Sequence, residues 1–86
     1  MQYQVEFFAE AEADLAELDT LVKRRVGRKI KWLSENFKSI VPEALSGEFK
    51  GKYKLRVGDY RVVYSINPNL KLILIHLIGH RREIYK

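Results

Sequence analysis

The stretch of this sequence that decides the fold is residues 52–66, KYKLRVGDYRVVYSI. Two runs of alternating residues flank Gly58-Asp59, a dipeptide typical of a two-residue hairpin turn. Such a turn pairs Val57 with Tyr60, and therefore Arg56 with Arg61. One face of the hairpin then carries apolar and aromatic side chains, namely Tyr53, Leu55, Val62, Tyr64 and Ile66. The other face carries Lys52, Lys54, Arg56 and Arg61, so a slip of one residue would bury the cations and the register is well specified.

Further strands are predicted around this hairpin. Residues 50–57, 60–66 and 70–78 alternate or run apolar as strands do, and Asn67-Pro68-Asn69 marks a turn between the last two. The third strand is apolar on both sides, which is typical of a central strand with both faces covered.

The amino-terminal half predicts one strand and two helices. Residues 3–8 alternate with a period of two, and helix formers dominate from Ala9 to about Asp19. Asp19 or Thr20 can cap a second helix, whose apolar residues recur every three or four positions: Val22, Val26, Ile30, Leu33 and Phe37. Residues 39–47 form a linker. The predicted fold class is α+β, with an N-terminal strand, an antiparallel helix hairpin and then a three-stranded antiparallel meander.

Length and composition indicate a single domain over residues 1–86. Of the 86 residues, 47% are hydrophobic and 31% charged, and the net charge is +5, a surplus that suits a polyanionic partner. The absence of cysteine excludes disulfides and thiolate metal sites, and two histidines are too few for a metal centre without carboxylates. We therefore expect no metal and no cofactor. No signal peptide or membrane span is recognised, which predicts a cytoplasmic protein.

The cations of the hairpin allow two interpretations. A charged sheet face is usually solvated surface. The histidines and the tryptophan of the chain also have purely structural explanations. His76 is expected to be a half-buried, hydrogen-bonded strand residue, His80 a surface or capping group, and Trp32 a core or partner-covered residue. The functional interpretation is a phosphate site, because metal-free RNA cleavage needs a base for the 2′-hydroxyl, cations around the phosphate and a proton for the leaving oxygen.

The chain resembles the RelE/ParE superfamily of type II toxin–antitoxin toxins, in particular its RelE-like branch. The resemblance rests on residues 50–64, KGKYKLRVGDYRVVY, on Ile78-Gly79-His80-Arg81 and on Ile84-Tyr85. It extends over the whole chain and implies a single RelE-like toxin domain with the RelE-like microbial RNase fold. It also implies an mRNA interferase: a ribosome-dependent, metal-independent endoribonuclease that cleaves the codon in the ribosomal A site and thereby inhibits translation.

The resemblance assigns catalytic roles to five residues. Lys52 and Lys54 would lie beside the scissile phosphate and help to activate the 2′-hydroxyl. Arg61 would stabilise the negative charge of the phosphorane. Arg81 would neutralise or protonate the leaving oxygen, and Tyr85 would orient or deprotonate the 2′-hydroxyl and stack on a base. The expected products are a 2′,3′-cyclic phosphate and a 5′-hydroxyl end.

Three further residues are expected to bind RNA by the same resemblance, namely Arg56, His80 and Arg82. The imidazole of His80, beside Arg81, is also a candidate for acid–base work. The identity of the general base therefore stays open among four residues: Lys52, Lys54, His80 and Tyr85.

The expected partners are the ribosome with its mRNA and an acidic antitoxin, which would form a hetero-oligomer with the toxin. Two alternatives share the fold. A ParE-like inhibitor of DNA gyrase would dispense with the catalytic set, and a catalytically inactive member would only bind RNA or its antitoxin. The retained set of two lysines, two arginines and a late tyrosine favours the ribonuclease.

Overall fold

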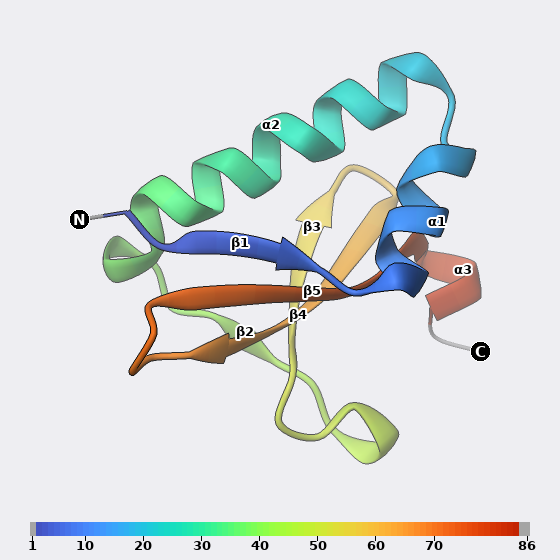
Figure 1. Cartoon of the computed structure of the whole chain (residues 1–86). Helices are drawn as coiled ribbons and strands as arrows, with labels where there is room; N and C mark the ends of the chain where they lie inside the picture. Colours follow the sequence, from blue (N-terminus) through green and yellow to red (C-terminus); the bar gives the residue numbers. More distant parts are fainter. Residues whose placement is uncertain (1, 85–86) are drawn as a thin grey trace.

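The computed structural model of the chain describes residues 2–84, which form a five-stranded mixed sheet with two long helices on one face (Figure 1). The elements in chain order are β1 (Gln4–Phe7), α1 (Ala9–Glu17), α2 (Thr20–Asn36), a 3₁₀ turn (Phe37–Ser39), β2 (Glu43–Ala44), a second 3₁₀ turn (Gly47–Phe49), β3 (Tyr53–Val57), β4 (Tyr60–Asn67), β5 (Leu72–His80) and α3 (Arg81–Ile84). The strand order is β1-β5-β4-β3-β2. The predicted α+β class and the strand–helices–meander order are confirmed.

The register of the central hairpin is the one predicted from its turn. Arg56 pairs with Arg61 and Val57 with Tyr60 across β3 and β4. Gly58 has a φ of 60° and Asp59 does not share the positive φ, which is the type II′ arrangement. The strand β3 begins at Tyr53 and not at residue 50, because the second 3₁₀ turn and a positive-φ glycine come first.

The strand β5 is an interior strand of the sheet, next to the middle strand β4, as its apolar sequence predicts. It pairs antiparallel with β4 on one side and parallel with β1 on the other. It begins at Leu72, two residues later than expected, because the preceding residues belong to the turn. There the amide of Leu70 donates to Asn67 Oδ1 at 3.2 Å, and Lys71 takes a φ of 50°.

The helices cover one face of the sheet and build the core with it. Asp19, one of the two predicted capping residues, caps α2, its Oδ1 accepting from the amide of Val22 at 3.0 Å. Figure 1 shows α2 running back across the sheet from the end of α1. Its buried residues Val26, Ile30 and Leu33 pack with the apolar side of the hairpin in one cluster, and each fully buried side chain of this kind stabilises the fold by about 1.5–3 kcal/mol.

Besides the two 3₁₀ turns, one strand and one helix were not predicted. The strand β2 lies in the predicted linker and pairs with β3 for two residues only, so its own sequence carries no alternation signal. The short helix α3 follows β5 directly. Within residues 2–84, no helix has both the length and the apolar character needed to cross a membrane.

Candidate functional site

The face of the sheet that points away from α1 and α2, here called the open face, holds three of the predicted site residues, Lys54, Arg56 and Arg61. Because strand residues alternate between faces, the residues next to each core residue along a strand point to the opposite side. The open face of β2, β3 and β4 consists of Glu43, Lys54, Arg56, Arg61, Val63 and Ser65. The hairpin therefore separates apolar and cationic side chains as its sequence predicted.

A single carboxylate lies among these cations. Glu43 pairs with Lys54 across β2 and β3, and its Oε2 lies 3.7 Å from Lys54 Nζ and 3.6 Å from Arg56 Nη2. Both pairs are partly solvent-exposed, so each contributes on the order of 1 kcal/mol or less. These contacts hold the cations in place, but an anion that binds more strongly can replace the Glu43 carboxylate.

Arg61 is the buried cation of the site, with only 8% of its surface exposed. Its Nη1 donates to the carbonyls of Gly58 and Tyr60 at 2.8 and 2.9 Å, so the guanidinium is held against the hairpin turn. Its Nε is buried and finds no acceptor within residues 2–84. A buried donor without a partner costs about 1–3 kcal/mol. Arg61 is therefore a fixed, desolvated positive charge.

A β-bulge reshapes the neighbouring strand. Val63 pairs with Leu77, but the next residue, Tyr64, pairs with Ile75. His76 is thus the extra residue of β5, opposed by none on β4. Bulges of this kind redirect side chains and are frequent beside functional sites.

The bulge places His76 on the open face. By simple alternation it would share the helix side with Ile78 and His80. Instead its Nε2 forms a 2.7 Å hydrogen bond with Ser65 Oγ, and its ring packs on Phe8 with a centroid separation of 4.5 Å. The expectation of a half-buried, hydrogen-bonded histidine is confirmed, but the face on which it lies could not be predicted.

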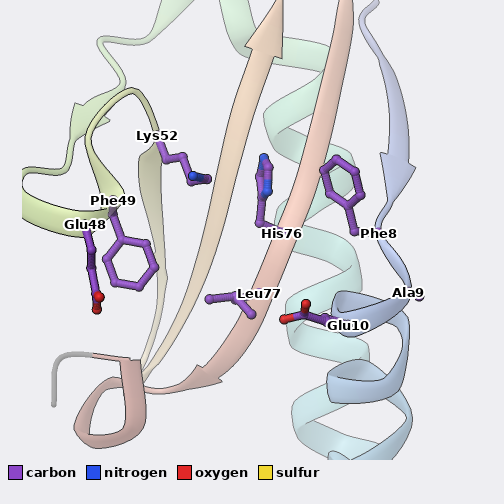
Figure 2. A pocket seen from close by; sticks show the side chains of 8 residues that line it. All are labelled: Phe8, Ala9, Glu10, Glu48, Phe49, Lys52, His76 and Leu77. Atoms are coloured by element: carbon purple, nitrogen blue, oxygen red, sulfur yellow. The ribbon is translucent and has the colours of Figure 1, made fainter.

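His76 and Lys52 line a common hollow of about 570 Å³ between the start of α1 and the second 3₁₀ turn. Figure 2 shows the Lys52 ammonium pointing toward the imidazole. Burial lowers the pKa of His76, and the nearby positive charge of Lys52 lowers it further, whereas Glu10 acts in the opposite direction. The imidazole is therefore mostly neutral at pH 7.

The short helix α3 brings the end of the described chain back to the hairpin. The amide of Arg81 donates to the carbonyl of Asp59 at 2.8 Å. Gly79, which pairs with Arg61, allows α3 to pack closely, since a Cβ there would lie 3.4 Å from Ile84 Cδ1. The start of α3 is therefore fixed beside the turn that also holds the Arg61 guanidinium.

Residues 5–85 match the family described as "ParE toxin of type II toxin-antitoxin system, parDE". The chain belongs to the RelE/ParE superfamily of type II toxin–antitoxin toxins. The toxin is 28% identical over 88 residues to a RelE-like toxin protein of Escherichia coli, covering 96% of this chain and 87% of that protein.

Solved structures of toxin–antitoxin complexes are similar to this toxin. The RelBE2 complex of Mycobacterium tuberculosis matches with a TM-score of 0.82 and 28% identity, covering 94% of this chain and 100% of that one. The RelE–RelB complex of Pyrococcus horikoshii matches with a TM-score of 0.70 and 27% identity, covering 94% and 97%. The RelE-like toxin fold is thereby shown.

The structure brings four of the predicted site residues of the toxin together. Lys54, Arg56 and Arg61 lie on adjacent strands of the open face, and Lys52 precedes β3 at the edge of the hollow. Arg81 and Arg82 follow β5 as exposed residues at the start of α3. Tyr85 lies outside the described residues.

His80 lies on the other face of the toxin. It pairs with Tyr60 across β4 and β5, their rings 5.5 Å apart, and lines a depression with acidic residues of α1. Its Nδ1 accepts from the amide of Arg82 at 3.2 Å, so it acts as the capping group that its position at a strand end suggests. The sheet thus separates its ring from Lys52 and Lys54, whereas His76 lies beside Lys52.

The tyrosines of the hairpin are packing residues: Tyr64 belongs to the core, and Tyr53 and Tyr60 pack against it. Burial raises the pKa of Tyr64 to about 12, with Tyr53 and Glu43 acting in the same direction. Tyr64 therefore keeps its proton at neutral pH and is no base. Within residues 2–84, no cluster of three or more histidine, aspartate or glutamate side chains is placed to hold a metal ion.

Proposed function

We propose that this toxin is a ribosome-dependent, metal-independent endoribonuclease that cleaves mRNA at the codon in the ribosomal A site. The observation that carries the proposal is the cationic open face, where Lys54, Arg56 and Arg61 lie on adjacent strands, together with the hollow lined by Lys52 and a neutral histidine. Cations held in a fixed arrangement stabilise the extra negative charge of a phosphorane.

The reaction is an internal transfer at phosphorus. The 2′-oxygen attacks the phosphorus and loses its proton to a base, the bond from phosphorus to the 5′-oxygen breaks, and that oxygen takes up a proton. The products are a 2′,3′-cyclic phosphate and a 5′-hydroxyl end. Arg61 stabilises the phosphorane, and Lys52 and Lys54 bind the phosphate and assist removal of the proton. Arg81 acts on the leaving oxygen, and Tyr85 acts on the 2′-hydroxyl or stacks on a base.

An acidic antitoxin silences the toxin by binding at the same cations. Glu43 already lies 3.6–3.7 Å from Lys54 and Arg56, so a carboxylate-rich segment of a partner finds positions suited to its charge. The similar RelBE2 and RelE–RelB structures are toxin–antitoxin complexes, which supports such a partner. Native mass spectrometry of the co-expressed pair is expected to give a hetero-oligomer, and a toxin that stays free would contradict this.

Primer extension on a reporter mRNA, programmed on purified ribosomes, tests the activity. Cuts within the A-site codon are expected with toxin, with no cuts when ribosomes are omitted, and chelation of free metal should not abolish them while the ribosomes stay intact. Intact mRNA would refute the ribonuclease. The family description names ParE, so a DNA supercoiling assay with gyrase would then test the alternative.

Two substitutions test the assigned residues. Arg81→Ala and Tyr85→Phe should each lower the cleavage rate by orders of magnitude. The backbone bond from the Arg81 amide to Asp59 survives the first change, so the thermal midpoint should be kept. Arg24→Ala removes an exposed cation from α2 and serves as the matched control. Wild-type rates in both variants would overturn the assignment.

A further inference from the structure

The hollow beside Lys52 has the composition of a ligand pocket. Its volume of about 570 Å³ lies within the roughly 300–1,000 Å³ typical of small-ligand sites. Three elements supply its walls: the start of α1, the bulge of β5 and the second 3₁₀ turn. The lining residues are Phe8, Ala9, Glu10, Glu48, Phe49, Lys52, His76 and Leu77.

Three aromatic rings face this hollow from separate elements. Figure 2 shows Phe49 on one side and His76 with Phe8 on the other. Phe8 remains 45% exposed although its ring packs on the imidazole at 4.5 Å. The Ser65 hydroxyl fixes the imidazole at 2.7 Å, so one aromatic wall is rigid and still offers apolar surface to a ligand. Exposed aromatic rings beside a cationic strand are the usual surface for unstacked bases of single-stranded RNA.

The charges of the hollow are divided between its walls. Lys52 supplies a cation on the side of the hairpin, and Figure 2 shows Glu48 and Glu10 lower in the same view, on opposite sides of Leu77. A phosphate is attracted to Lys52 and repelled by the two carboxylates. The carboxylates can instead accept hydrogen bonds from amino groups, which lie on the edges of cytosine, adenine and guanine.

We propose that this hollow binds one unstacked nucleobase of the RNA, with preference for a base that carries an exocyclic amino group. The base lies against Phe49 and the Phe8–His76 pair, and its phosphate lies at Lys52. The role of this subsite in choosing a codon rests on the proposed ribonuclease function, but base binding itself does not. An apolar side chain of an antitoxin is the competing occupant.

NMR titration of the isotope-labelled toxin with 2′-O-methyl trinucleotides tests the subsite, because these probes lack the attacking hydroxyl and cannot be cut. A probe with central cytosine should shift the signals of Phe8, Phe49 and His76 and bind more tightly than its uracil counterpart. Phe49→Ala should weaken binding roughly 5- to 150-fold, the range of one lost base–aromatic stack. Phe49→Tyr keeps the ring and should stay near wild type.

Two further variants keep the test decisive. Phe8→Ala removes a half-exposed ring and should also weaken binding without loss of the fold, whereas Leu70→Ala removes an exposed side chain from the distant β4–β5 turn and should have no effect. Unchanged affinity in both phenylalanine variants, or shifts confined to other surfaces, would overturn the subsite. The subsite would also be overturned if an antitoxin shifted the signals of these residues and the trinucleotide probes did not.

The ribosome assay separates this proposal from the general function. Wild-type toxin that binds the probes but leaves ribosomal mRNA intact would refute the ribonuclease and keep the subsite. If the wild-type toxin cleaves mRNA and the Phe8 and Phe49 variants cleave it at the same codons and the same rate, the subsite is refuted and the ribonuclease is kept.

Discussion

Replacing Gly58 by alanine should destabilise the toxin, although the same change elsewhere in the chain should stabilise it. Gly58 takes a φ of 60° at the first central position of the hairpin turn. An L-residue in such a sparsely populated region costs about 1–3 kcal/mol. Alanine lowers the conformational entropy of the unfolded chain, which offsets about 0.4–1 kcal/mol of this cost. The free energy of unfolding should therefore fall by about 1–2 kcal/mol.

The surroundings of Gly58 add little to this loss. An added Cβ would lie 3.0 Å from Nη2 of Arg25, but that atom ends a flexible, exposed side chain and can move away. A change of 1 kcal/mol shifts the thermal midpoint of a domain of this size by about 4–8 °C. Thermal unfolding followed by circular dichroism should therefore show a Tm lowered by roughly 5–15 °C.

Gly27→Ala is the matched control within the same molecule. Gly27 lies in the middle of α2, is exposed, and has no atom within 4 Å of an added Cβ. Alanine in an exposed helix is more stable than glycine by about 0.5–1 kcal/mol, so Tm should rise by a few degrees. If Gly58→Ala leaves Tm equal to or above that of Gly27→Ala, the reasoning about turn strain is refuted.

Three further predictions concern the site. Arg61→Met should lower the proposed cleavage by about 100- to 1,000-fold with little change in Tm, because two lost carbonyl bonds are offset by removal of a buried Nε without an acceptor; unchanged cleavage would contradict its role. Glu43→Gln should tighten binding of a non-cleavable RNA about two- to fivefold at low salt, an effect that should vanish in high salt when measured by fluorescence anisotropy. Because burial lowers the pKa of His76 in the folded toxin, the unfolded state binds its proton first as the pH falls below about 6.5. Wild-type Tm should thus fall more than that of His76→Gln between pH 7.5 and 5, and parallel curves would exclude this linkage.

Much of the site was predictable because it depends on local rules. The turn Gly58-Asp59 fixes which residues are opposite each other, and alternation along β3 and β4 then gathers Lys54, Arg56 and Arg61 on one face. The spacing of apolar residues predicted α2 in the same way, since one helix face must be buried for the helix to be stable. The capping role of Asp19 also depends only on residues within one turn.

The ion-pair and hydrogen-bond partners of the individual cations could not be predicted from the sequence. Glu43 lies within ion-pair distance of Lys54 and Arg56 only because the two-residue strand β2 pairs with β3. The inward fold of the Arg61 guanidinium onto two carbonyls has no signal in a sequence that alternates as this one does.

The α+β class, the hairpin register and the cationic face could be predicted from the sequence alone, because local backbone geometry and periodicity set all three. The resemblance to RelE/ParE toxins came separately, from the motifs in residues 50–64 and 78–85. Two features could be seen only in three dimensions: β1 pairs in parallel with β5, and a bulge turns His76 onto the open face while His80 stays on the helix side. Strand pairing and bulges arise from backbone hydrogen bonds between distant segments. Those bonds are nearly independent of side-chain identity, so they leave no local pattern to read.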